Sequence, residues 1–151
     1  MNKRANISTI VPDGYKAMSG LEAYIRNSGI EHSLLHLVKT RASQINGCAF
    51  CLDMHTKDAR AQGETEQRLY CLSAWRETPF YTDRERAALE WTESVTRVSE
   101  AGVSDDLYAR MLRHFTEEEL ANLTLAVVTI NGWNRMAIAF RSEAGSYRPS
   151  T

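Results

Sequence analysis

Hydrophobic residues recur at helical spacing along almost the whole chain, and this periodicity limits the possible folds more than any other feature. Between residues 31 and 45, for example, Leu35, Val38, Ala42 and Ile45 keep a three-four-three spacing that places them on one face of a helix. No stretch alternates apolar and polar residues for long enough to predict a half-buried strand. The sequence therefore predicts an all-α fold, a helical bundle.

Capping patterns indicate where several helices begin. Thr82 with Glu85, and Thr116 with Glu119, have the spacing of a capping box, in which two side chains satisfy the first free N–H groups of a helix. Ser104 is a third capping candidate, and Asn46-Gly47 interrupts the pattern. The expected helices follow Pro12, run from Glu31 to Ile45, and begin at Cys48, Thr65, Thr82, Ser104 and Thr116, with Tyr15, Met18, Ile25, Ala88, Trp91, Val95 and Val98 facing inward.

The chain has the size and composition of one globular domain. Its 151 residues are 43% hydrophobic, and no repeat or linker divides them, so we expect a single domain over residues 1–151 with a core from about 15 to 141. The apolar stretch from Leu120 to Phe140 carries Asn131, Asn134 and Arg135, which favours a buried or interface helix over a membrane span. Within it, Trp133, Asn134 and Arg135 either line a site or an oligomer contact or serve helix packing. Packing is the favoured interpretation, with Asn134 satisfied by a local hydrogen bond.

Charge and targeting signals suggest no macromolecular partner. The net charge is −1 and the Lys and Arg residues are scattered, so nothing in the sequence recruits nucleic acid or an anionic membrane. The N-terminal residues lack the apolar run of a signal peptide, which predicts a cytoplasmic protein. The 3 cysteines are an odd number, and two of them are close together, so a secreted disulfide framework is disfavoured.

The segment from Cys48 to His55 carries the chemistry. Residues three and four apart share a helix face, so Cys48, Cys51 and His55 are expected to project together. A helix N-terminus stabilises a thiolate, and a nearby imidazole can accept the proton. We therefore expect Cys51 to be the nucleophile, Cys48 to be the resolving thiol, and His55 to relay the proton.

Other interpretations of the cysteines remain open. Cys48, Cys51, His55 and Cys71 are four ligand types that zinc accepts, although zinc sites usually lie in loop-rich segments. Alone, Cys71 is expected to be a small buried hydrophobe. Leu52 after Cys51 excludes a c-type haem motif. An aromatic group follows this region and is expected to lie in the core or at a subunit interface: Tyr70, Trp75, Phe80 and Tyr81.

Three stretches resemble the alkylhydroperoxidase D-like branch of the carboxymuconolactone decarboxylase family. They are residues 41–55, 63–69 and 130–135, and the resemblance extends from about Leu34 to Phe140. It implies an all-helical fold that forms homo-oligomers, commonly trimers or hexamers. It also implies a C-x-x-C pair that reduces peroxides or serves a peroxiredoxin partner, with no bound cofactor. Electrons then come from an external dithiol such as a lipoylated protein.

The resemblance also implies a proton relay, and here the sequence departs from the family pattern. The second cysteine and the histidine four residues later, Cys51 and His55, are joined in that relay by a glutamate twelve residues before the first cysteine; this chain has His36 there. A histidine can pass a proton near neutral pH, but it cannot act as the anionic partner of a protonated imidazole. Two interpretations of His36 stay open: a relay residue, or a surface or interface residue.

Three functions compete at this point. The first is a peroxidase that uses the thiol pair. The second is a decarboxylase or isomerase acting on a lactone, as in the other branch of the family, which does not need paired thiols. The third is a redox-sensing or structural oligomer in which the pair only switches between dithiol and disulfide.

Overall fold

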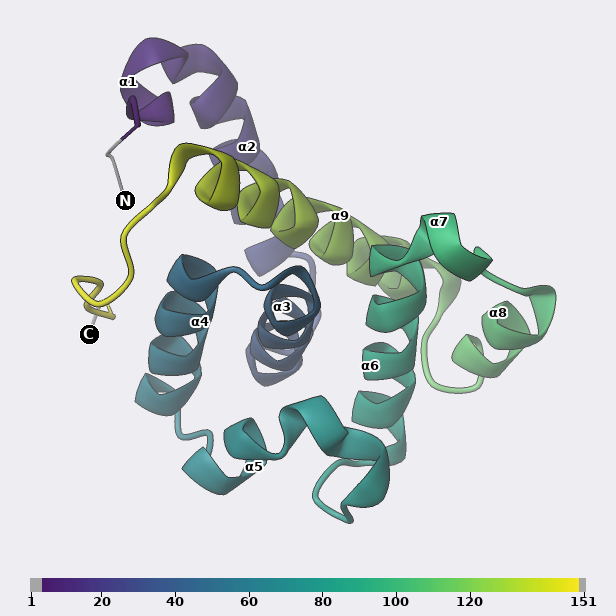
Figure 1. Ribbon diagram of the computed structural model, residues 1–151. Coiled ribbons are helices and arrows are strands. Elements are labelled where there is room, and N and C mark those ends of the chain that lie inside the picture. Colours follow the sequence, from purple (N-terminus) through teal and green to yellow (C-terminus); the bar gives the residue numbers. More distant parts are fainter. Residues whose placement is uncertain (1–3, 150–151) are drawn as a thin grey trace.

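The fold is organised around one central helix, α3. The computed structural model describes residues 4–149, and within that range every regular element is a helix (Figure 1). The all-α prediction is confirmed. The elements are α1 Ile7–Ile10, α2 Pro12–Arg26, α3 His32–Asn46, α4 Ala49–Ala61, α5 Glu66–Tyr70, the 3-10 helix η1 Leu72–Glu77, α6 Asp83–Thr96, α7 Val98–Ala101, α8 Asp105–Met111 and α9 Glu117–Phe140.

Helix α3 is enclosed because three other helices pack on it. Helices α4, α6 and α9 all lie against it, and Figure 1 shows them arranged around its axis. Leu35 and Leu37 are two residues apart, so they lie on opposite sides of α3, and both are buried in different apolar clusters. A helix that is covered on several sides needs apolar residues beyond a single stripe, and α3 has them.

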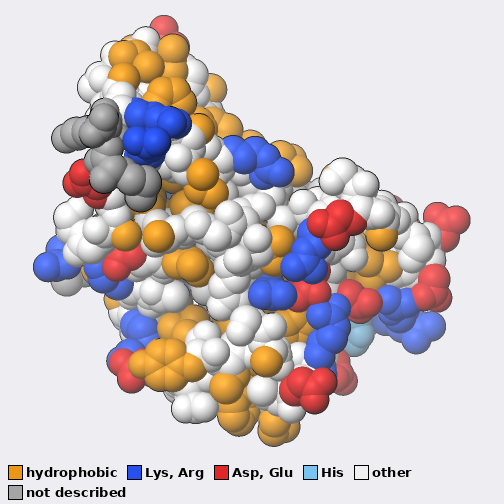
Figure 2. All heavy atoms as spheres, in the orientation of Figure 1, with side chains coloured by type: hydrophobic (Ala, Val, Ile, Leu, Met, Phe, Trp, Pro, Cys, Tyr) orange, Lys and Arg blue, Asp and Glu red, His pale blue; other side chains and the backbone are white. Residues whose placement is uncertain are grey.

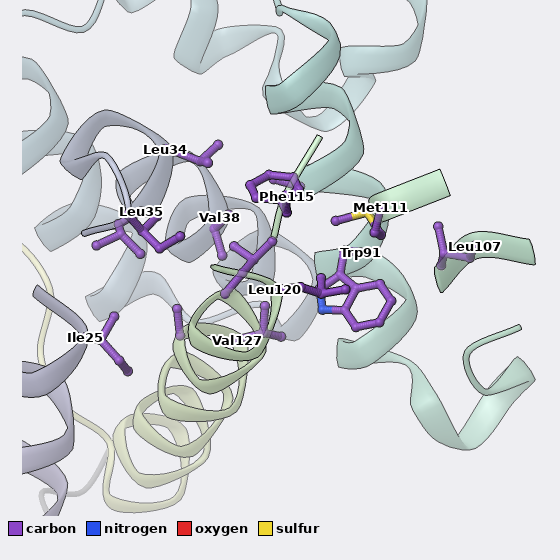
Figure 3. Packing of buried hydrophobic residues seen from close by; sticks show 14 residues of the cluster. Ile25, Leu34, Leu35, Val38, Trp91, Leu107, Met111, Phe115, Leu120 and Val127 are labelled. Atoms are coloured by element: carbon purple, nitrogen blue, oxygen red, sulfur yellow. The ribbon is translucent and has the colours of Figure 1, made fainter. Parts of the chain in front are cut away.

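The largest apolar cluster joins α3, α6 and α9 and is shown in Figure 3. Trp91 of α6 is at the edge of this cluster, and its indole Nε1 donates a hydrogen bond to Thr124 at 3.0 Å. The polar end of the ring is thus satisfied while its apolar body is buried. The labelled members are Ile25, Leu34, Leu35, Val38, Trp91, Leu107, Met111, Phe115, Leu120 and Val127.

Four predicted helix starts are confirmed. Thr82 with Glu85, and Thr116 with Glu119, form complete capping boxes at α6 and α9. Thr65 and Ser104 cap α5 and α8 through their side-chain oxygens. These caps depend on residues three positions apart, which is why sequence alone could locate them.

Two expectations about inward-facing residues, those for Val98 and Tyr15, are wrong. Helix α6 ends at Thr96 because Arg97 leaves the helical backbone conformation, so Val98 is 57% exposed instead of continuing the stripe. The aromatic group divides: Trp75 and Tyr81 are buried with Leu72 in a second cluster, whereas Tyr70 is 70% exposed. Phe80 is also exposed.

The second concerns Tyr15, which is 36% exposed because α2 packs on α9 with one side only: the Tyr15 ring meets Trp133 edge-on at 5.1 Å and is otherwise open to solvent. Of α2, only Ile25 is buried. Figure 2 shows hydrophobic side chains at this end of the molecule, where Ile10 of α1 and the adjacent Val11 are exposed. Assembly of several copies through helices stays a prediction.

Helix α9 is buried against α2, α3, α4 and α6 over much of its length. In residues 4–149, no helix combines the length and apolar character that a bilayer span requires.

Candidate active site

The thiol pair is positioned by the turn between α3 and α4. Gly47 ends α3 in the left-handed conformation, with φ of 68° and ψ of 32°. The chain then turns so that the backbone N–H of Cys48 donates to the carbonyl of Ser43 at 3.0 Å. Cys48 has an extended backbone and occupies the N-cap of α4, and the helix proper begins at Ala49. The turn therefore places the first cysteine just outside the helix and Cys51 within its first turn.

We expect Gly47→Ala to lower the free energy of unfolding by about 1–2 kcal/mol, because a Cβ is strained in the left-handed region. The matched control is Gly20→Ala in the interior of α2, where an added Cβ has open space. That change should be neutral or stabilise by up to about 1 kcal/mol. Urea unfolding of the two variants checks this, and equal effects would contradict the role assigned to the turn.

The two sulfurs of the pair lie together in the interior. Sγ of Cys48 and Sγ of Cys51 are 2.7 Å apart, and each residue is 1% exposed. The backbone N–H of Cys51 also donates to Sγ of Cys48 at 3.4 Å. Both cysteines are free. Their apolar neighbours are Ala42, Ile130 and Ala137, with the half-buried Phe50 and Trp133 packed against the cluster.

Hydrogen bonding favours the anion on Cys48. The bond from the Cys51 thiol lowers the pKa of Cys48 to about 7 against the opposing effect of burial, aided by the backbone N–H groups of Cys51 and Phe50. The same bond, together with burial, raises the pKa of Cys51. This differs from our expectation, which placed the thiolate on Cys51. The reason is that Cys48 occupies the N-cap itself, where the free N–H groups of the first turn point.

Asn134 of α9 is the residue at this site whose role the sequence analysis misjudged. It is fully buried, its Oδ1 accepts from Nδ2 of Asn46 at 2.9 Å, and its Nδ2 donates to Oγ of Ser43 at 3.0 Å. Its side chain also forms hydrogen bonds that lower the pKa of both Cys48 and Cys51. The predicted local hydrogen bond is therefore wrong: these partners come from α3 and α4. The one signal available was the presence of a polar residue at this position in the apolar stretch of α9.

His55 lies one turn beyond Cys51 on α4 and is buried. Burial, together with the charges of Lys39 and His36, lowers its pKa to about 3. Its Nε2 is buried and has no hydrogen-bond partner among the described residues. The ring is therefore neutral at physiological pH.

His36 lies on α3, half-buried, and acts on His55 through its charge. Burial lowers its own pKa, although a hydrogen bond with Gln62 opposes this, and its Nδ1 has no hydrogen-bond partner within residues 4–149. It borders a hollow of about 240 Å³ that is also lined by Ala59 and Gln62. The structure thus gives His36 contact with the α3–α4 interface, while its part in a proton relay stays a prediction.

Cys71 is apart from the pair. It is half-buried at the end of α5, not the fully buried hydrophobe we expected, and its Sγ accepts from Nε2 of Gln67 at 3.6 Å. Within residues 4–149, no three His, Cys, Asp or Glu side chains come together in a way that would hold a metal ion. The zinc interpretation needs Cys71 as a ligand, and these positions give it no support.

The fold and the site define an all-helical protein with a buried dithiol at the N-terminus of a helix. The chain belongs to the carboxymuconolactone decarboxylase family, whose family model matches residues 12–94. This confirms the family resemblance stated from the sequence.

Similar proteins agree with this membership. YdfG of Bacillus subtilis, named only as an uncharacterized protein, is 47% identical over 97% of this chain and 99% of its own length. A solved structure from Agrobacterium tumefaciens, of unknown function and named as a candidate antioxidant defence protein AhpD, is 45% identical with a TM-score of 0.92, covering 97% of this chain and 100% of that one. An alkylhydroperoxidase AhpD core structure from Ralstonia eutropha is 18% identical with a TM-score of 0.81, covering 92% and 74%, and shares the fold.

Proposed function

We propose that this protein is a thiol-dependent peroxidase, in which Cys48 and Cys51 reduce a peroxide and an external dithiol restores them. The observation that carries the proposal is the buried contact between the two sulfurs at the start of α4, 2.7 Å apart. Family membership and the likeness to AhpD-type antioxidant proteins support the same proposal, because both suggest a peroxidase-like role. A pair that only packed in the core would have no need of a hydrogen-bonded, ionisable sulfur.

The reaction begins with the Cys48 thiolate. Its sulfur attacks one peroxide oxygen, the O–O bond breaks, and the leaving alkoxide takes the proton that Cys51 holds. Cys48 is then a sulfenic acid and Cys51 a thiolate. Cys51 attacks the Cys48 sulfur and expels hydroxide, which closes a disulfide. The sulfurs already lie side by side, so little movement is needed.

An external dithiol completes the cycle. One of its thiolates attacks the disulfide, and its second thiol releases the mixed disulfide, so the pair is reduced and the external dithiol is oxidised. We propose a lipoylated protein as the natural source of this dithiol, or a peroxiredoxin as a partner in the exchange. The protein itself then needs no bound cofactor.

Burial limits the substrate. The half-buried Phe50 and Trp133 pack on the cysteine cluster, and both cysteines are 1% exposed. We therefore propose hydrogen peroxide and small organic hydroperoxides as substrates, with the two aromatic rings providing apolar contact for an organic tail.

We expect the purified protein, supplied with dihydrolipoamide, to consume hydrogen peroxide well above the uncatalysed rate. The double variant Cys48→Ser/Cys51→Ser should fall to that background, because no other described cysteine adjoins the pair. Cys71→Ser is the matched control and should retain full turnover. Peroxide consumption that persists in the double variant would contradict the proposal, as would carbon dioxide release from a muconolactone after both thiols are alkylated.

A further inference from the structure

Asn134 approaches the thiol pair from a different part of the chain. It lies in the middle of α9, the C-terminal helix, whereas both cysteines belong to the start of α4. It is fully buried, as are Cys48 and Cys51 to within 1%. An uncharged amide buried without partners would cost stability, so its hydrogen bonds define what it does.

The hydrogen bonds of Asn134 fix the orientation of its amide. Its Oδ1 accepts from Asn46, and one hydrogen of its Nδ2 goes to Ser43. Since an amide nitrogen carries two hydrogens, one donor remains. Ser43 and Asn46 both lie in the last turn of α3, directly before the turn that delivers Cys48. Ile130 and Ala137 share this face of α9 with Asn134 and pack against the two cysteines, so the remaining donor lies on the side of α9 that faces the sulfurs.

We infer that Asn134 stabilises the thiolate of the Cys48–Cys51 pair by donating its second Nδ2 hydrogen to it, and so sets the reactivity of the nucleophile. The one remaining hydrogen serves one sulfur at a time, and a hydrogen bond from it lowers the pKa of whichever cysteine accepts it. The site then has two sources of donors, the backbone at the start of α4 and one side chain of α9. This inference rests on the proposed function, since it names a residue that prepares the peroxidase nucleophile.

The neighbouring network supplies a matched control. Asn131 lies one turn earlier on α9, and its Oδ1 accepts from the same Asn46 Nδ2 at 3.0 Å. Its own Nδ2 donates to Thr96 and to the carbonyl of Val127 instead of a sulfur. Removing Asn131 therefore disturbs the same network without removing a donor from the thiol pair.

The test is the pH dependence of iodoacetamide alkylation, read for each cysteine by mass spectrometry. Asn134→Asp keeps the shape of the side chain but replaces the donor with a carboxylate, so the midpoint should rise by about one to two pH units. Asn134→Ala, which removes the donor without adding charge, should raise the alkylation midpoint by about 0.5 to 1 pH unit. Asn131→Ala should leave the midpoint where it is in the wild type.

A purely structural role would give a different result. The Asn134 variants would then lose thermal stability while the alkylation midpoint stayed unchanged, and that outcome overturns the inference; so does an equal shift in Asn131→Ala. If Asn134→Asp fails to fold, the alanine variant decides, because alanine is a strong helix former. Alkylation needs no peroxide, so the two proposals can fail separately. If the Asn134 variants shift the alkylation midpoint but the wild-type protein does not consume peroxide, only the proposed function is overturned.

Discussion

Cys48→Ser is expected to abolish peroxide turnover and to leave no sulfenic acid on the protein, whereas Cys51→Ser should react with one equivalent of peroxide and then stop. The reason is the direction of the hydrogen bonds at the start of α4. Sγ of Cys48 accepts from the backbone N–H of Cys51, and its pKa is lowered to about 7, while the pKa of Cys51 is raised. The thiolate is the attacking species, so the residue that ionises is the one that cannot be replaced.

A sulfenic-acid trap followed by mass spectrometry measures this result directly. In Cys51→Ser the trap should label Cys48 in nearly every molecule after one equivalent of peroxide, and steady-state consumption should remain at background because no disulfide forms. The Cys71→Ser variant should behave as wild type. Labelling of Cys51 in the Cys48→Ser variant would contradict the assignment and return the nucleophile to Cys51.

The exchange of roles that we propose for the two cysteines concerns a detail that spacing alone cannot decide. C-x-x-C predicts that two sulfurs meet near a helix N-terminus, and they do. Which sulfur carries the charge depends on whether the helix begins at the first cysteine or after it. That boundary is fixed by the left-handed Gly47 and the extended Cys48, a difference of one residue. Helix boundaries read from sequence are uncertain by more than this.

Local features of the fold were predictable because their causes are local. The capping boxes at Thr82 and Thr116 depend on residues three positions apart, and the apolar stripe of α3 on its own spacing. Asn134 shows the opposite case. Its partners on α3 and its action on the cysteines depend on how α9 packs against α3 and α4, which no pattern within α9 encodes. Sequence reasoning could identify an unusual polar residue but not its partners.

Protein stability is expected to fall by about 2 kcal/mol between pH 7 and pH 5 because of His55 alone. In the folded protein, burial lowers the pKa of this ring to about 3, whereas in the unfolded chain it is about 6.5. As the pH falls below 6.5, the unfolded state binds a proton that the folded state cannot, so each pH unit costs up to about 1.4 kcal/mol. The effect continues until the pH approaches the folded pKa. Carboxyl groups titrate mainly below pH 5, so they add little in this window.

The His55→Leu variant tests the origin of this loss, because leucine has no proton to bind. Urea unfolding at pH 7, 6 and 5 should show the stability difference between pH 7 and pH 5 shrinking by about 2 kcal/mol in the variant. His36→Gln serves as the comparison: its pKa is also lowered, but the side chain is only half-buried, so its removal should flatten the curve less. If the free energy of unfolding depends on pH equally in the wild type and in His55→Leu, the ring takes up a proton in the folded state. His55 would then be a base strong enough to receive a proton from Cys51. A flattened curve instead supports a neutral imidazole, which leaves the proton between the two sulfurs.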